Sequence, residues 1–276
     1  MVNPAPAPKL MEAVIYPDPA RSLLVRAPLR SAAIFLAIVV VYAVSLTIVD
    51  FDLARLWRGL PRLAHYAASA WPPDLRELDI LLYRALETMA IAVIGTTIGA
   101  VIALPCCILG AKNVTPGLWI YRPVRAFLNI VRAIDSFVFA LLFVIAVGVG
   151  PFAGVLGMGL HSAGTLAKLW SEVIETVEPG PLEAVSLTGA NRLKVISYAL
   201  FPDVLPNFTS IALYVWEFNV RASTALGIVG AGGIGQELKN SVDQLLFDRT
   251  FTILIIIVIM VMALDQLSSW LRRRLL

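Results

Sequence analysis

The sequence predicts an all-α polytopic membrane protein with about six transmembrane helices, and three observations indicate this class. Of its 276 residues, 59% are hydrophobic and only 15% are charged, whereas a soluble domain has about 25% charged residues. The mean hydropathy is +0.82. Uncharged runs such as 31–49 and 88–111 are each long enough, as helices, to cross a hydrocarbon core about 30 Å thick.

The N-terminal part of the chain precedes the main apolar region. Residues 1–30 are rich in proline and are expected to form a cytoplasmic arm. The first span, 31–49, is expected to stay in the protein, because no small-residue cleavage site of a signal peptide is evident. Residues 50–83 mix arginines and aspartates with apolar residues at helical spacing. This pattern predicts an amphipathic helix on the outer membrane surface, with an ordinary extracytoplasmic loop as the alternative.

The later spans follow from the points where apolar runs are broken. The uncharged stretch 136–167 is too long for one span. Residues 148–151 (Gly-Val-Gly-Pro) divide it, because proline cannot continue the helical hydrogen bonds. The third span is therefore expected near 124–147 and the fourth near 151–170. The fifth and sixth are expected at about 207–229 and 249–270, which puts both termini on the same side.

The distribution of basic residues indicates which side is the cytoplasm. Thirteen of the 22 Lys and Arg residues lie in the arm, two loops and the tail on one side, and seven lie on the other. Cytoplasmic segments carry the excess of Lys and Arg. We therefore expect both termini, and the loop that follows the fourth span, to be cytoplasmic. The net charge of +3 follows from this asymmetry and does not indicate nucleic-acid binding.

The segment 179–206, between the fourth and fifth spans, is the most informative stretch. Residues 179–181 (Pro-Gly-Pro) end one helix and begin another, with proline at an early helical position where its missing N–H is not needed. Gly189 permits a sharp bend. A second short helix is expected to follow and to end at Pro202 and Pro206. A polar segment of this kind in an apolar chain predicts a docking site for a soluble partner.

The same segment resembles the signature of the permease subunits of binding-protein-dependent ABC importers. That signature is Glu-Ala-Ala, three residues, Gly, nine residues, Ile, one residue and Leu-Pro. This chain has Glu183-Ala184-Val185, Gly189, Ala199 and Phe201-Pro202. Its departures, Val185, Ala199 and Phe201, are all apolar replacements. The resemblance implies a cytoplasmic coupling helix, and the residues it assigns to coupling with an ATPase are Glu183, Ala184, Gly189, Ala190 and Pro202.

The resemblance extends over residues 84–276 and is to the phosphonate-type branch of these permeases. Its stretches include 132–143, 147–155, 161–164, 168–172 and 220–235. The piece 229–235 is shared with methionine-type permeases. The branch implies a type I importer core in a bacterial inner membrane, carrying phosphonate or a related phosphorus oxyanion. Methionine, phosphate or phosphite are alternative cargoes, and an ion-coupled secondary transporter is an alternative class.

The resemblance also implies the partners. No G-x-x-x-x-G-K-[ST] sequence occurs, so energy is expected from a cytoplasmic ATPase dimer that binds ATP and Mg. This chain is expected to be neither an enzyme nor a cofactor-binding protein. Its other implied partners are a second copy of itself and an extracytoplasmic substrate-binding protein, within membrane lipids.

Three further features are interpreted as structural. Residues 230–235 fit the dinucleotide pattern GxGxxG, but they follow an expected membrane helix, whereas that fold requires a preceding strand. A flexible turn at the outer mouth is expected instead. The adjacent Cys106 and Cys107 are expected to be packing residues, since vicinal cysteines rarely form an unstrained bridge. Gly95 and Gly99 form a GxxxG pair that favours close helix packing.

Ionisable residues inside the expected spans are candidates for the translocation path, because charges in a membrane are expensive. Glu217 and Arg221 are four residues apart on one helix face and could pair, near the midplane. Arg132 and Asp135 could pair similarly. Two interpretations stay open for these pairs: the arginines attract an anionic substrate, or the residues form ion pairs within the protein. His161 could contact substrate or bond to a neighbouring helix.

Overall fold

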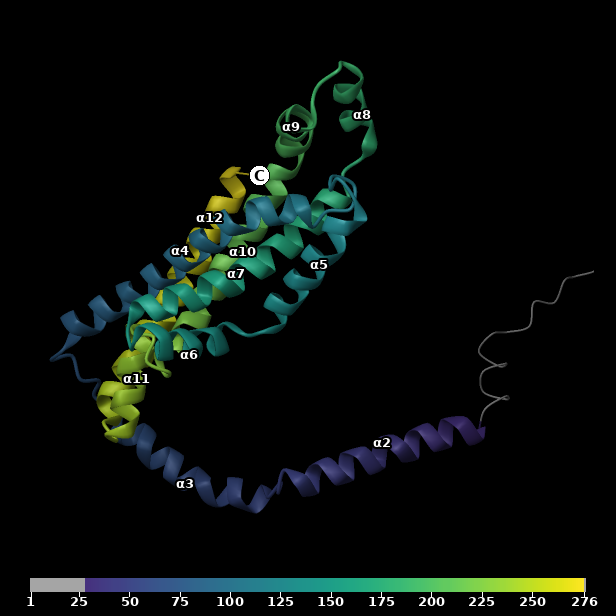
Figure 1. Cartoon of the computed structure of the whole chain (residues 1–276). Helices are drawn as coiled ribbons and strands as arrows, with labels where there is room; N and C mark the ends of the chain where they lie inside the picture. Colours follow the sequence, from purple (N-terminus) through teal and green to yellow (C-terminus); the bar gives the residue numbers. More distant parts are fainter. Residues whose placement is uncertain (1–27, 276) are drawn as a thin grey trace, which may run out of the picture. The chain divides into compact units, whose positions relative to one another are not determined.

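The computed structural model describes residues 28–275, which are helical and contain no strand (Figure 1). The expected arm, 1–30, lies almost entirely outside the described residues. The chain divides into two units, residues 1–63 and 64–276. Each unit is described by itself.

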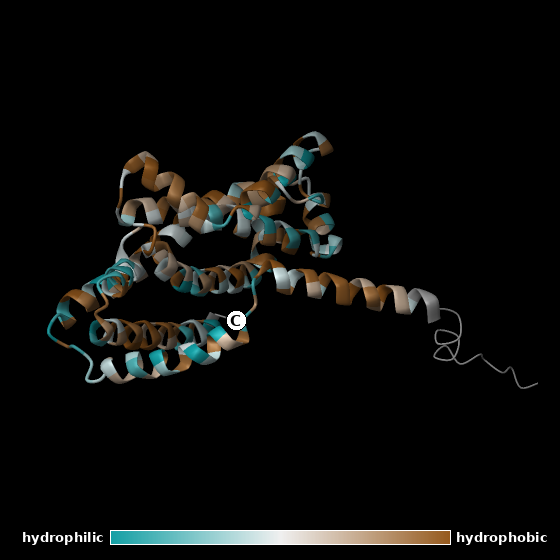
Figure 2. Ribbon diagram, turned by 90° about the horizontal axis from the view of Figure 1, so that it is seen from below, coloured by the Kyte–Doolittle hydropathy of each residue, from teal (hydrophilic) through white to brown (hydrophobic). Residues whose placement is uncertain are grey.

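The described part of the first unit contains the helix α2 (Pro28–Ile48) and most of α3 (Leu53–Ser69). Every side chain of α2 from residue 31 onwards is exposed, and Figure 2 shows hydrophobic residues along nearly its whole length. A helix that is hydrophobic on all sides requires an apolar surrounding such as a bilayer. Asp52 begins α3, where its Oδ1 accepts a hydrogen bond from the N–H of Ala54 at 2.8 Å. The location of α3 at a membrane surface stays a prediction.

The second unit is a bundle of long helices with shorter helices at its ends (Figure 1). The long helices are α4 (Leu78–Leu109), α7 (Pro151–Glu175), α10 (Phe201–Gly227) and α12 (Phe247–Leu275). The shorter elements are α5 (Leu118–Ala133), α6 (Ser136–Val147), α8 (Pro179–Leu187), α9 (Arg192–Val195), the π-helical turn η1 (Ile196–Leu200) and α11 (Gly233–Asp243). The most extensive contact joins α4 to α7.

Small residues explain why α4 and α7 approach so closely. A Cβ atom added to Gly99 would lie 2.6 Å from the Cβ of Ser162, and one added to Gly95 would lie 3.1 Å from the Cβ of Met158. The packing expected from the Gly95–Gly99 pair is therefore confirmed. Cys107 is fully buried, and both cysteines are free thiols, as expected.

The expected third span is not one helix. The chain bends by 86° between α5 and α6. Asp135 begins α6, because its Oδ1 accepts a hydrogen bond from the N–H of Phe137 at 2.8 Å. The third span expected near 124–147 is thus formed by two helices, and Arg132 and Asp135, which could have paired, form no ion pair within the described residues. The Asp135 carboxylate caps α6, whereas Arg132 lies in the last turn of α5.

The all-α class with several apolar helices is confirmed. Within the described residues, α2, α4 and α12 are long and apolar enough to cross a membrane, and the bent pair α5–α6 is a possible fourth span. The predicted fourth and fifth spans correspond to α7 and α10, which do not meet the same test of apolarity. Much of α7 is buried against other helices. Because this face does not contact lipid, it can consist of small and polar residues. The total of six stays a prediction.

Candidate functional site

The polar segment between α7 and α10 forms a hairpin of short helices, here called the α8–η1 hairpin (residues 179–200). Pro179 lies at the start of α8, as expected. Gly189 adopts a φ of +78°, a conformation that favours glycine, and makes the bend predicted there. Asn191 then caps α9, accepting a hydrogen bond from the N–H of Lys194 at 3.0 Å.

The second short helix does not end at Pro202 and Pro206, contrary to expectation. The helix continues from η1 into α10, with Pro202 in the first turn of α10 and Pro206 inside it. A proline ring meets the carbonyl group four residues earlier in a regular helix. The wider π-helical turn Ile196–Leu200 occupies this position before Pro202. The hairpin is therefore joined to α10 by an unbroken run of helix.

Exposed apolar side chains distinguish the hairpin from an ordinary polar loop. Leu187, Leu193 and Tyr198 are 86%, 74% and 76% exposed. Of the residues assigned to coupling, Glu183, Ala184, Gly189 and Pro202 are exposed and Ala190 is half-buried. Glu183 and Ala190 also line a cavity of about 320 Å³ that includes Asn113 and Val114 of the turn between α4 and α5. Exposed apolar groups with a polar rim are typical of a protein-binding surface.

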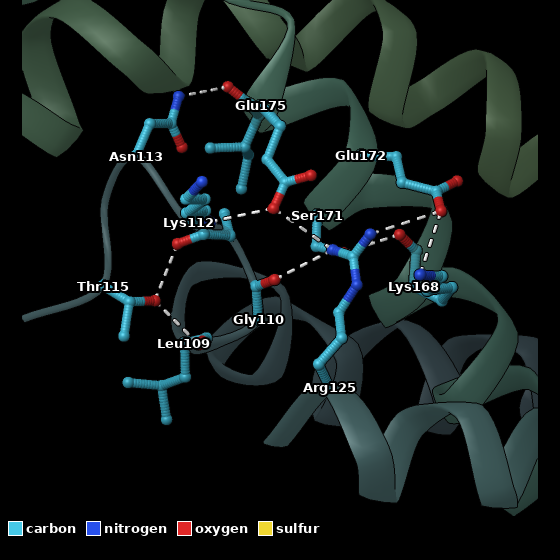
Figure 3. A network of polar contacts seen from close by, with 12 residues as sticks. Leu109, Gly110, Lys112, Asn113, Thr115, Arg125, Lys168, Ser171, Glu172 and Glu175 are labelled. Carbon is cyan, nitrogen blue, oxygen red and sulfur yellow. Dashed lines mark hydrogen bonds and ion pairs between the residues drawn. The ribbon is translucent and has the colours of Figure 1, made fainter. Parts of the chain in front are cut away.

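A polar network joins α5 and the turn before it to the last turns of α7, directly before the hairpin (Figure 3). The Arg125 guanidinium group donates hydrogen bonds to the carbonyl oxygen of Gly110 and the Oγ of Ser171, both at 3.0 Å. It also lies 3.3 Å from a carboxylate oxygen of Glu175 and 3.4 Å from one of Glu172. α5 and the end of α4 are thereby tied to the last turns of α7, directly before the hairpin.

The turn between α4 and α5 adds two bonds to this network. The N–H of Lys112 donates to the Oε1 of Glu175 at 2.9 Å, and the side-chain amide of Asn113 donates to the carbonyl oxygen of Ile174 at 2.7 Å. Sequence reasoning missed the network because its members are far apart along the chain. The only local signal was the spacing of Lys168, Glu172 and Glu175 on one face of α7.

The predicted pair of Glu217 and Arg221 is confirmed and is part of a larger cluster. Their closest charged atoms are 2.6 Å apart. Arg221 also lies 2.8 Å from a carboxylate oxygen of Asp265, and Arg272 lies 2.8 Å from the second oxygen of Glu217. Each of these charged side chains therefore has a partner of opposite charge, which agrees with the interpretation of Glu217 and Arg221 as an internal ion pair. A role of Glu217 and Arg221 in the path stays a prediction.

The position of Glu217 near the midplane of a membrane stays a prediction. The fifth span was expected to begin at about residue 207, whereas α10 begins at Phe201. The partner Arg272 lies in the last turn of α12. Glu217 is therefore level with the basic end of α12.

A separate cavity of about 240 Å³ brings together Arg132 and His161, two of the predicted path residues. Its lining residues, from α5, α7 and α10, are Arg132, His161, Thr165, Tyr214, Val215, Phe218 and Asn219. His161 Nδ1 lies 2.8 Å from the carbonyl oxygen of Ile134, at the break between α5 and α6. The bond to a neighbouring helix that was expected for His161 is thus present.

Asn219 is the residue of this cavity that sequence reasoning missed. It is fully buried, and its Nδ2 donates to the Oγ1 of Thr96 at 2.8 Å and to the Oγ of Ser162 at 2.7 Å. It thereby joins α10 to α4 and α7. The one signal in the sequence was an amide side chain inside an apolar helix, between Phe218 and Val220.

The glycine-rich turn at the other end of α10 is buried, not the flexible turn expected. Gly232 and Gly233 have φ angles of +79° and +74°. The N–H of Ile234 donates to the Oγ1 of Thr88 at 2.8 Å, which holds the turn against α4. The turn follows the helix α10, not a strand, so the context of a dinucleotide fold is lacking here.

The bundle of long helices, the exposed hairpin between two of them and the interrupted span α5–α6 define the membrane-spanning subunit of a transport system. The chain belongs to the family described as binding-protein-dependent transport system inner membrane component, whose family model matches residues 95–276. Several of its homologues are named as phosphite, phosphonate or phosphate permeases.

Two relatives from Stutzerimonas stutzeri match over most of their length. HtxC, assigned to a phosphite transport system as a permease protein, is 46% identical over 88% of this chain and 86% of its own. The phosphite transport system permease protein PtxC is 38% identical over 80% of this chain and 81% of its own. Among solved structures, a chain of the MetNI methionine ABC transporter matches with a TM-score of 0.65 and 22% identity, over 74% of this chain and 99% of that one. This likeness shows the fold.

Proposed function

We propose that this chain is the permease subunit of an ATP-driven importer for phosphonate or a related phosphorus oxyanion such as phosphite. The observation that carries the proposal is the 46% identity to HtxC across 88% of the chain. The exposed α8–η1 hairpin supports it, because a permease without a nucleotide-binding loop requires a surface on which an ATPase can dock.

The proposal includes three partners. A cytoplasmic ATPase dimer binds ATP and Mg and contacts the hairpin through Glu183, Ala184, Gly189 and Ala190. A second copy of this chain completes the path, and an extracytoplasmic binding protein delivers the substrate. Both termini lie on the cytoplasmic side of a bacterial inner membrane, in agreement with the excess of basic residues on that side.

The connections of the hairpin support a mechanical role. Its two ends continue into α7 and α10, so a displacement of α8 acts on both long helices. The Arg125 network carries the same displacement to α5 and the end of α4. Because α4 and α7 pack closely, the helices of the second unit respond together, and access to the path alternates between the two sides of the membrane.

Transport by the complete system tests the proposal. The chain would be reconstituted in liposomes with its ATPase and binding protein, and uptake of phosphite would be measured with and without ATP on the ATPase side. We expect uptake to require ATP. Glu183→Lys should remove at least nine-tenths of uptake and release the ATPase during purification, because it reverses the charge of a residue at the docking surface.

The matched control is Asp243→Lys, which makes the same kind of charge change at an exposed residue on α11. It should retain both uptake and the bound ATPase. Phosphite uptake driven by an ion gradient in vesicles without any ATPase would contradict the proposal and would instead indicate a secondary transporter.

A further inference from the structure

The helix α3 (Leu53–Ser69) has an apolar face that the described part of the chain leaves exposed. Its larger apolar side chains recur at intervals of three or four residues, which places them on one side of a helix. They are Leu53, Leu56, Trp57, Leu60 and Leu63, and their exposed fractions lie between 44% and 76%. No residue of α3 is buried. Apolar groups gathered on one exposed face mark a surface that binds another molecule or a membrane.

The opposite face of α3 is basic. Arg55, Arg58 and Arg62 recur at the same helical spacing, and the helix contains no Asp or Glu. Arg55 and Arg58 lie 3.4 and 3.5 Å from a carboxylate oxygen of Asp52, directly before the helix, whereas Arg62 has no such partner among the described residues. With these arginines α3 is not among the helices apolar enough to cross a membrane. A two-sided helix of Leu, Trp and Arg is typical of one that lies in a membrane surface.

Both ends of α3 are next to helices that are long and apolar enough to cross a membrane. The apolar helix α2 ends at Ile48, and only residues 49–52 separate it from α3. Near the other end, and within the second unit, the ring of Tyr66 stacks on that of Phe247, the first residue of α12, with centroids 4.6 Å apart. Tyr66 follows Arg62 by four residues and so lies on the basic side, which leaves the apolar face free. These neighbours favour a bilayer as the partner that covers this face.

We propose that α3 lies in the plane of the membrane surface, in the leaflet where α2 ends, and binds phospholipids there. The leucines and Trp57 enter the boundary of the acyl chains, a depth that suits a ring with one polar N–H group. On the other face, Arg58 and Arg62 stay level with the lipid phosphates, to which guanidinium groups donate charge-assisted hydrogen bonds. The partner is the phospholipid bilayer and not a second copy of this chain. The proposal depends neither on the cargo nor on the ATPase.

Fluorescence quenching at the two faces of α3 tests this directly. Leu60→Cys places a thiol on the apolar face, and Arg62→Cys places one on the nearly opposite basic face. Each full chain would carry an uncharged fluorophore on that thiol, in vesicles of phosphatidylethanolamine and phosphatidylglycerol. The unsubstituted chain, with Cys106 and Cys107, gives the background signal. Lipid spin-labelled on its acyl chain should quench the label at position 60 at least twofold more than the label at position 62. Aqueous iodide and lipid spin-labelled on its headgroup should show the reverse preference.

A second pair, Leu56→Cys and Arg58→Cys, repeats the comparison one helical turn earlier and should give the same pattern. All four side chains are exposed, so each variant should keep the melting temperature of the unsubstituted chain. Three results would overturn the proposal. Iodide could quench both faces equally, which places the apolar face in water. The apolar face could be shielded from iodide without quenching by lipid, which means that protein covers it. Acyl-chain spin labels could quench both faces equally, which means that α3 is immersed in the bilayer.

Polar replacements test whether apolar burial holds α3 at the membrane. Adding Leu56→Gln and Leu63→Gln to the Leu60→Cys chain should raise quenching of its label by iodide at least twofold. The control adds His65→Gln and Ser69→Gln, two exposed positions on the polar side, and should leave the label shielded. Unchanged shielding after the leucine replacements would contradict the proposal. These measurements require neither ATP nor substrate, so a chain without ATP-driven uptake would refute the importer function and leave the test of α3 valid.

Discussion

At the scale of single residues, the second unit contains two kinds of charged side chain. Arg125, Arg221 and Arg272 each have acidic partners within about 3.5 Å, whereas Arg132 has none among the described residues. Paired charges hold helices in register, and their removal leaves a partner without compensation. The partners, more than the residue type, therefore distinguish the arginines that hold helices together from Arg132.

Loss of Arg125 should weaken the attachment of α5 to the last turns of α7. Arg125→Gln keeps part of the side-chain length but leaves Glu175 and the carbonyl oxygen of Gly110 short of a strong donor. We expect a destabilisation of about 1–3 kcal/mol, since the Arg125 side chain is only 16% exposed. Thermal unfolding in detergent, followed by tryptophan fluorescence, measures this. Arg122→Gln is the control, and an equal melting temperature for both variants would contradict a structural role of the network.

Charge compensation should reveal the role of the Glu217–Arg221 pair. If these side chains only neutralise each other, Arg221→Gln alone leaves excess negative charge at Glu217 and Asp265 and lowers phosphite uptake. Adding Glu217→Gln should then restore at least half of the lost uptake. If Arg221 instead attracts the substrate, the double variant should transport no better than Arg221→Gln. Uptake by the reconstituted transporter distinguishes these results.

At the scale of elements, contact between α4 and α7 organises the second unit. Gly99 faces the backbone of α7, where an added Cβ would lie 3.0 Å from both the carbonyl oxygen of Gly159 and the amide nitrogen of Ala163. Neither backbone atom can move aside without moving the helix. The GxxxG spacing was sufficient to predict that this face of α4 packs closely, because small residues at that spacing act locally on one helix face, but it did not specify α7 as the partner.

Gly99→Ala should therefore force the two helices apart. We expect a loss of about 1–3 kcal/mol of stability, the usual range for an overpacked core. Gly117→Ala is a suitable control, because a Cβ atom there meets nothing within 4 Å and the backbone is extended. A lower melting temperature for Gly99→Ala alone is the expected result. Equal melting temperatures would show that α4 and α7 separate without loss of stability.

Predictions failed where the sequence signal was spread over distant residues. The break between α5 and α6 was missed because apolarity was averaged over a span, although Asp135-Ser136 before an apolar run is a recognisable helix start. The unbroken helix through Pro202 depends on a π-helical turn, which no residue pattern specified. The cavity around Asn219 depends on three helices meeting, and the bridging role of this side chain becomes visible only when Thr96 and Ser162 are seen to use the amide nitrogen.

At the scale of the whole molecule, composition and the motif at Glu183 were sufficient to predict the class. The family match over residues 95–276 confirms that prediction. Local patterns succeed here because a bilayer imposes long apolar helices on any chain that crosses it. Partner docking is different, since it depends on which side of the membrane the α8–η1 hairpin faces. That orientation rests on the excess of basic residues and on the motif.

Cross-linking from the tip of the hairpin tests this central claim most directly. Leu187 is 86% exposed, and Leu187→Cys, treated with a short bifunctional reagent in whole membranes, should join this chain to its ATPase. Lys239→Cys, at an exposed residue of α11 on the side assigned to the outside, should give no such product. Labelling of position 187 by an impermeant reagent from outside the cell, without a cross-link to the ATPase, would contradict the account.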